Sequence, residues 1–138
     1  MEELKNILTQ GNHSLVLRTR DGQVLTFDGR GVSDLRNLLS NQKNLLCGAV
    51  VADKVVGKAA AALMVLGGVV GLHALLISEG ALSLLAKYNV KVEFDQKTDH
   101  IINRTNTGWC PMENACRDCT TAEECLVEIE KTIKNITK

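Results

Sequence analysis

The sequence predicts a single α/β domain built around a mixed sheet of five strands. Two observations support this class: strand-like apolar runs alternate with helical patterns in the middle of the chain, and a hairpin signal precedes them. The length of 138 residues suits one domain, and an apolar fraction of 45% is too high for a disordered chain. Residues 1–138 are therefore expected to fold as one unit.

The first 40 residues are expected to form a helix, a hairpin and a second helix. Apolar residues recur at helical spacing over residues 2–10. Two β-type runs, 14–19 and 23–27, flank the dipeptide Asp21-Gly22, which is typical of a two-residue hairpin turn. Leucines on one face after Ser33 predict the second helix.

The middle of the chain is expected to alternate between strand and helix. Asp53 and Ser78 each follow an apolar run and are placed to cap the helix that comes next. Short connections imply right-handed crossovers and parallel strands, with the hairpin as an antiparallel edge. The three strands and the two helices between them are predicted at 45–52, 54–66, 69–77, 79–88 and 90–94.

The C-terminal segment, residues 110–138, contains four of the five cysteines and is expected to be helical. Pro111 suits the first turn of a short helix that begins near Cys110. The sequence from Thr121 to Glu124 is a capping box for a final helix.

Composition and charge limit the expected partners and compartment. Lys and Arg together number 16, as do Asp and Glu, and the four aromatic residues offer few stacking surfaces, so nucleic acid is not an expected partner. The uncharged run 59–77 is long enough to span a membrane. Gly67-Gly68 divides it into a helix-forming half and a β-branched half, which favours a buried helix–turn–strand unit. The charged N-terminus lacks an export signal, which predicts a cytoplasmic protein.

Two helix starts are expected at the carboxyl ends of parallel strands, where α/β sheets bind ligands. Lys54 and Lys58 are four residues apart and would share a helix face, and Gly57 between them would allow a ligand to approach closely. Free N–H groups and lysines at helix N-termini suit a small anionic ligand, of which a nucleotide is one type. The alternative is that Asp53 and Ser78 only cap their helices and that the lysines are solvated.

The segment 101–113 is rich in directional polar groups and is interpreted as a binding loop. Asn103 and Arg104 offer hydrogen-bond donors to bases, carboxylates or phosphates, and Gly108 permits a tight turn. The alternative is an ordinary loop held by structural hydrogen bonds. Together with the two helix starts, the expected ligand-binding residues are Asp53, Lys54, Gly57, Lys58, Ser78, Glu79, Asn103, Arg104, Thr107 and Gly108.

A second hypothesis is an enzyme of unknown reaction. Glu79 at a helix start is a candidate general acid or base. Cys110, placed at the start of a short helix, is a candidate reactive thiol, and Lys58 is a candidate nucleophile.

A third hypothesis is a metal-stabilised interaction module. Cys110, Cys116, Cys119 and Cys125 have the spacing C-x5-C-x2-C-x5-C, and four thiolates so close in sequence suit zinc or an iron–sulfur cluster. The alternative is that these are small buried or surface thiols. The fold class also allows a homodimer, although no feature of the sequence demonstrates one.

Four sequence blocks together resemble the uncharacterised family DUF1893, over roughly residues 1–113: 52–61, Ser78-Glu79, Asn103-Arg104 and 107–113. That family is similar to the cytidine deaminase-like fold, which implies a three-layer α/β/α sandwich around a mixed five-stranded sheet. Deaminases hold zinc with His and Cys at two helix starts. The corresponding segments here, 53–58 and 78–82, contain neither residue. No metal is therefore expected at the deaminase zinc position, and zinc-dependent deamination is not expected.

Overall fold

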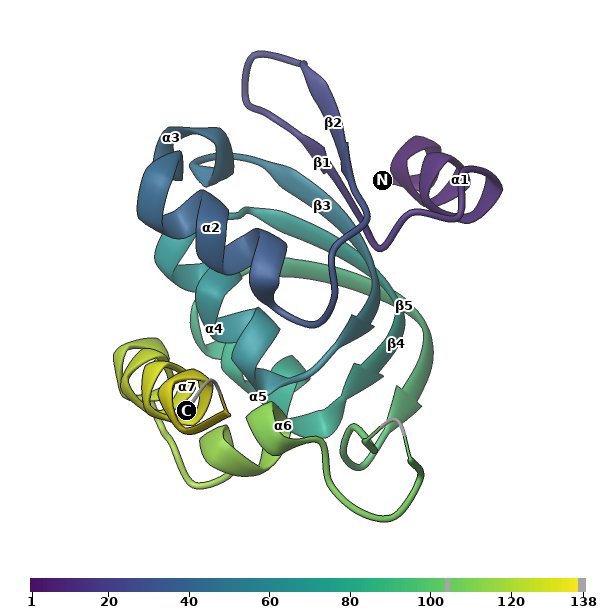
Figure 1. The fold of residues 1–138 in the computed structure, drawn as a ribbon. Coiled ribbons are helices and arrows are strands. Elements are labelled where there is room, and N and C mark those ends of the chain that lie inside the picture. The colour runs from purple at the N-terminus through teal and green to yellow at the C-terminus, as the bar shows by residue number, and fades with distance from the viewer. Residues whose placement is uncertain (104, 137–138) are drawn as a thin grey trace.

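The computed structural model describes residues 1–103 and 105–136 and contains a mixed five-stranded sheet with the order β2-β1-β3-β4-β5 (Figure 1). β1 pairs antiparallel with β2 and with β3, whereas β3, β4 and β5 run parallel. The predicted α/β class and the antiparallel hairpin at the sheet edge are confirmed. The strands are β1 (Leu15–Arg18), β2 (Val24–Phe27), β3 (Val50–Val56), β4 (Gly71–Ser78) and β5 (Lys91–Thr98).

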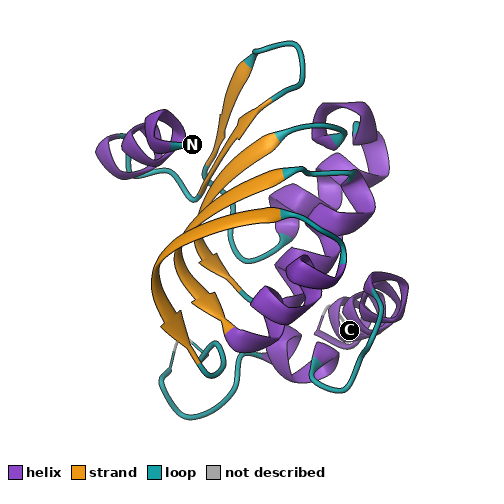
Figure 2. Cartoon of the chain, turned by 180° about the vertical axis from the view of Figure 1, so that it is seen from behind, coloured by secondary structure: helices purple, strands orange, loops and turns teal. Residues whose placement is uncertain are grey.

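Helices cover the two faces of the sheet unequally (Figure 2). The short helix α1 (Glu2–Gln10) packs on one face, where Leu4 and Leu8 form a cluster with Val16 and Ala52. The other face is covered by α2 (Ser33–Asn41), α3 (Lys43–Leu46), α4 (Lys58–Gly67), α5 (Glu79–Lys87), α6 (Pro111–Cys116) and α7 (Ala122–Ile136).

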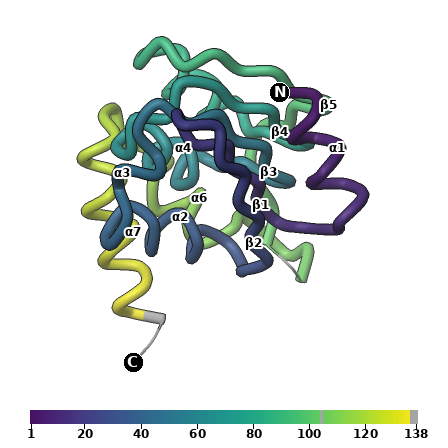
Figure 3. Tube along the Cα trace, turned by 90° about the horizontal axis from the view of Figure 1, so that it is seen from above, coloured from purple at the N-terminus to yellow at the C-terminus, as the bar shows by residue number. Residues whose placement is uncertain are grey.

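Helix α4 lies at the centre of the larger helical layer. It contacts α2, α5, α6 and α7, and most of its residues are buried. Seen from above, α1, the sheet, α4 and α7 follow one another across the molecule (Figure 3). Gly68, with a φ of +91°, ends α4 in the left-handed conformation, as its position between a helical and a strand-like run predicts. No helix in the described part of the chain is both long and apolar enough to cross a membrane.

The hairpin is closed by a three-residue loop instead of the predicted two-residue turn. Thr19 N–H donates to the Gln23 carbonyl at 2.8 Å, which leaves residues 20–22 as the loop. Gly22 N–H donates back to the Thr19 carbonyl, and Gly22 has a φ of +93°. The glycine therefore supplies the left-handed residue that follows the turn, a common alternative for this kind of hairpin.

The boundary between β3 and α4 lies further along the chain than predicted. Residues 43–46 form the short helix α3, and β3 continues through Val55 and Val56 before α4 begins at Lys58, with Gly57 as its N-cap. The physical reason is that β-branched valines favour the strand and that β3 has a partner on each side to extend against. The prediction that Asp53 caps a helix is wrong, because Asp53 is a strand residue paired with Leu15 and Ala74.

Three predicted helix starts are confirmed. Ser78 caps α5 by accepting a hydrogen bond from the Ala81 N–H at 3.2 Å. Pro111 occupies the first turn of α6. The capping box of α7 is reciprocal, since Thr121 Oγ1 accepts from the Glu124 N–H at 3.1 Å and Glu124 Oε1 accepts from the Thr121 N–H at 3.0 Å.

Candidate functional site

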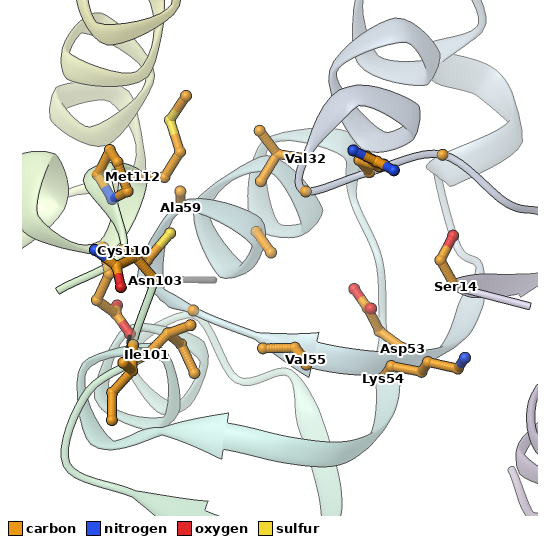
Figure 4. A pocket seen from close by; sticks show the side chains of 18 of the residues that line it. Ser14, Val32, Asp53, Lys54, Val55, Ala59, Ile101, Asn103, Cys110 and Met112 are labelled. Carbon is orange, nitrogen blue, oxygen red and sulfur yellow. Dashed lines mark hydrogen bonds between the residues drawn. The ribbon is translucent and has the colours of Figure 1, made fainter. Parts of the chain in front are cut away.

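An open cavity of about 730 Å³ lies at the carboxyl end of β3 (Figure 4). Its walls come from residue 14 before β1, the loop 29–32 before α2, residues 53–55 of β3, residue 57, residues 59–60 of α4, and residues 101–103, 105 and 110–113. The carboxyl ends of strands are the usual ligand sites of α/β sheets. The cavity is therefore the candidate functional site.

Asp53 places a carboxyl group in this cavity. Figure 4 shows its side chain directed into the space, whereas the neighbouring Lys54 extends away along the strand and its Nζ donates to Asn12 Oδ1 at 2.7 Å. Burial raises the pKa of Asp53 to about 7, although hydrogen bonds from the Val55 and Lys54 backbone N–H groups act in the opposite direction. At neutral pH the Asp53 carboxyl is therefore present in both protonation states.

A second carboxylate, Glu113, occupies the N-terminus of α4. Its Oε1 accepts from the Lys58 N–H at 2.8 Å and from the Ser78 hydroxyl at 3.3 Å, and its Oε2 accepts from the Ile101 N–H at 2.7 Å. Only 4% of Glu113 is exposed. The positive end of the helix dipole and three donors together compensate the buried charge. The chain thus fills with its own carboxylate the helix start that the sequence predicts for an external anion.

The two lysines of the predicted anion site are not brought together. Lys54 belongs to β3 and Lys58 to the first turn of α4, so the prediction that they share a helix face is wrong. Lys58 Nζ donates to the backbone carbonyls of Arg117 at 3.2 Å and of Cys119. Its ammonium group therefore fixes the loop between α6 and α7.

The second helix start, unlike that of α4, lies outside the cavity. Ser78 is fully buried and hydrogen-bonded, and the exposed Glu79 carboxylate lies 3.8 Å from Lys97 Nζ. Neither residue lines the cavity. The Glu79 carboxylate, a candidate general acid or base, therefore faces solvent and not the cavity.

The loop 101–113 forms part of the cavity wall and is held by hydrogen bonds of its own. Asn103 lines the cavity, but the Asn103 side chain also closes the loop, because Oδ1 accepts from the Thr107 N–H at 3.0 Å and Nδ2 donates to Thr107 Oγ1 at 3.1 Å. Thr107 and Gly108 do not line the cavity. Arg104, the other predicted ligand-binding residue here, lies outside the described residues.

Five candidate residues from the sequence do line the cavity, and several others were missed. The predicted residues on its walls are Asp53, Lys54, Gly57, Asn103 and Cys110. Cys110 lies on the opposite wall from Asp53 (Figure 4). The missed residues include Ser14, Arg30, Val32 and Glu113. An arginine flanked by glycines, at 29–31, is a sequence signal that would have indicated Arg30, whereas no local pattern links Glu113 to α4.

Three of the C-terminal cysteines gather in one place, apart from Cys110. The thiols of Cys116 and Cys119 both interact with that of Cys125, and these hydrogen bonds, with Cys116 contributing most, lower the pKa of Cys125 to about 7. The interactions described for these three thiols do not include Cys110.

The sequence predicts a metal site at four cysteines of the C-terminal segment. Within residues 1–103 and 105–136, no group of three or more His, Cys, Asp or Glu side chains is arranged to hold a metal ion. A zinc or iron–sulfur site at Cys110, Cys116, Cys119 and Cys125 stays a prediction. Elemental analysis of anaerobically purified protein tests it.

A family model described as a domain of unknown function (DUF1893) matches residues 3–133. The chain belongs to the DUF1893 family. It is also similar to the crystal structure of a DUF1893 family protein (TM1506) from Thermotoga maritima. The two chains are 25% identical, with a TM-score of 0.84, and the match covers 94% of this chain and 87% of the other. A search of curated proteins found no match.

Within this DUF1893 structure, the two segments compared with the deaminase zinc motifs meet at a carboxylate. Gly57 caps α4 and Ser78 caps α5, and Glu113 from α6 binds both Lys58 N–H and the Ser78 hydroxyl. The likeness to the cytidine deaminase-like fold stays an expectation. At this end of the sheet the DUF1893 chain has a cavity into which the Asp53 carboxyl group is turned.

Proposed function

We propose that this DUF1893 protein binds a small molecule of the nucleotide type in the cavity at the end of β3. The heterocycle of the ligand would donate N–H groups to the Asp53 carboxylate, and its anionic group would lie near Arg30. The observation that carries this proposal is the Asp53 carboxyl, held on a strand and directed into the cavity.

The environment of Asp53 favours a ligand that donates hydrogen bonds. Desolvation raises the pKa of Asp53, so the carboxylate form is costly as long as nothing but its own backbone N–H groups binds it. Carboxyl groups with strongly shifted pKa values in cavities are found more often at functional sites than elsewhere. A ring N–H beside an exocyclic amino group, as nucleobases present, can donate to both oxygens of a carboxylate at once.

The walls of the cavity suit a flat apolar body. Val32, Val55, Ala59, Ile101 and Met112 all line it. Its volume of about 730 Å³ is within the usual range for small-molecule sites. A base and a sugar would therefore fit between these side chains with Asp53 at one edge of the base.

Arg30 supports the anionic part of the proposed ligand. It is exposed on the loop 29–31 and lines the cavity, and no ion-pair partner is found for it among the described residues. A guanidinium binds phosphate or carboxylate oxygens in a bidentate manner. Because Glu113 occupies the start of α4, Arg30 is a better anion partner in this proposal than the helix start.

Calorimetric titration with nucleosides and nucleoside monophosphates tests this function. We expect Arg30→Ala to weaken the binding of the monophosphate by roughly tenfold, the loss of about one charge-assisted hydrogen bond, and to leave the parent nucleoside unaffected. Arg20→Ala, which removes an exposed arginine outside the cavity, is the matched control. If no nucleoside or nucleotide produces heat at millimolar concentration, the proposal is wrong.

A further inference from the structure

A group of three cysteines lies where α6, its following loop and α7 meet, and it is independent of the cavity. Cys116 ends α6, Cys119 is in the loop, and Cys125 is in the first turns of α7. Cys116 and Cys125 are fully buried, whereas Cys119 is partly exposed. The Cys125 thiol interacts with both of the others.

Lys58 places a positive charge beside this cysteine group. Its Nζ donates to the carbonyls of Arg117 and Cys119, and its positive charge acts on all three thiols. An ammonium group stabilises a thiolate and repels a metal cation. At Cys119, however, burial outweighs this charge and raises the pKa to about 11, whereas hydrogen bonds from the neighbouring thiols, that of Cys116 first, lower the pKa of Cys125 to about 7.

The loop between Cys119 and Cys125 is held in a compact form. Glu124 Oε1 accepts from the N–H groups of Thr120 and Thr121, both at 3.0 Å. These contacts hold the two ends of a short segment near each other, which lowers the entropy cost of closing a covalent ring.

From this arrangement we propose that Cys119 and Cys125 form a reversible disulfide by exchange with low-molecular-weight disulfides. The Cys119 thiolate attacks one sulfur of the external disulfide, forms a mixed disulfide and releases one thiolate. The Cys125 thiolate then attacks the Cys119 sulfur and releases the second thiolate. In total, two protein thiols are oxidised to one disulfide, and the external disulfide is reduced to two thiols.

Accessibility determines which pair reacts. An external disulfide can reach Cys119 because that thiol is partly exposed, whereas Cys116 and Cys125 have no exposed surface. Because burial raises the pKa of Cys119 to about 11, the first step is expected to become faster as the pH rises above neutral. The Cys125 thiol interacts with that of Cys119, and hydrogen bonds from Cys116 and Cys119 lower the pKa of Cys125 to about 7. Cys125 therefore supplies the thiolate for the second step. Cys116 is expected to remain reduced.

Incubation of the full chain with glutathione disulfide, followed by mass spectrometry, tests this proposal. Cys47→Ser and Cys110→Ser together provide the background, because these two thiols also have exposed surface and would carry adducts of their own. We expect the product to be lighter by two hydrogens and to carry no glutathione. Trypsin cuts after Arg117 and Lys131, so the predicted disulfide lies within one peptide, whereas any pair with Cys116 would join two peptides.

Two further variants separate the steps. In the same background, Cys125→Ser should accumulate one glutathione on Cys119, and Cys116→Ser should still form the disulfide. Circular dichroism confirms that each variant is folded before it is scored. A persistent mixed disulfide in the background protein, a disulfide to Cys116, or no reaction at all would each overturn the proposal.

Discussion

Replacing Glu113 with alanine should lower the free energy of unfolding by about 3–5 kcal/mol, the range expected when a buried hydrogen-bonded charge network is broken. The substitution leaves the N–H groups of Lys58 and Ile101 and the hydroxyl of Ser78 without their common acceptor. It also leaves a cavity, because Glu113 is buried. For a domain of this size the loss corresponds to a fall in Tm of about 10–17 °C, which a thermal melt measures.

A graded pair of variants tests whether hydrogen bonding causes that loss. Glu113→Gln keeps the volume and one acceptor oxygen, so its loss should be about 1–3 kcal/mol, intermediate between wild type and alanine. Ser78→Ala removes only the 3.3 Å contact and the cap of α5, and should have an effect of about 1 kcal/mol. An alanine variant at 113 that unfolds within 1 kcal/mol of wild type would contradict the role given to this carboxylate.

Replacing Asp53 with asparagine should stabilise the protein at pH 8 and have almost no effect at pH 4. Burial raises the pKa of Asp53 from its ordinary value of 3.8 to about 7 in the folded state, so the folded state binds the proton more tightly than the unfolded state does. The free energy of unfolding therefore falls as pH rises from about 4 to about 7. Asparagine mimics the protonated side chain, and the expected gain above pH 7 is about 2–4 kcal/mol. Chemical denaturation at a series of pH values measures it.

The same substitution should remove ligand binding. The carboxylate form of Asp53 accepts the proposed N–H groups, so the affinity of the wild-type protein for a nucleoside should rise between pH 6 and pH 8, and Asp53→Asn should abolish this dependence. Asp118→Asn is a suitable control, because the Asp118 side chain is 94% exposed. Stabilisation together with loss of binding is the pattern expected of a functional residue. A variant that binds as well as wild type would contradict the role of Asp53.

Local patterns in the sequence were sufficient for most of the fold. Three local signals have the predicted structure, and each acts on neighbours a few residues away: Gly68, Pro111 and the capping box that begins at Thr121. The end of β3 was misplaced because its length depends on pairing with β1 and β4, which are remote in sequence. Aspartate commonly caps helices, but Asp53 lies within β3.

The candidate site was harder to predict than the fold, because its key contacts are long-range. Glu113 is separated by 55 residues from the Lys58 N–H to which it is bonded. An anion site at a helix start follows from local sequence, but its occupation by a side chain of the same chain does not. Asp53 stays a candidate, but the helix cap that suggested it is absent, and the structure places it in β3 on the wall of the cavity.

The contact of Glu113 with the start of α4 also has a consequence for the order of events during synthesis. The ribosome releases β3, α4 and β4 well before residue 113. Until that residue emerges, the amide of Lys58 and the hydroxyl of Ser78 lack the acceptor that they bind in the finished protein. A nascent chain arrested before this point would lack one wall of the candidate site, which would close only when the C-terminal third arrives.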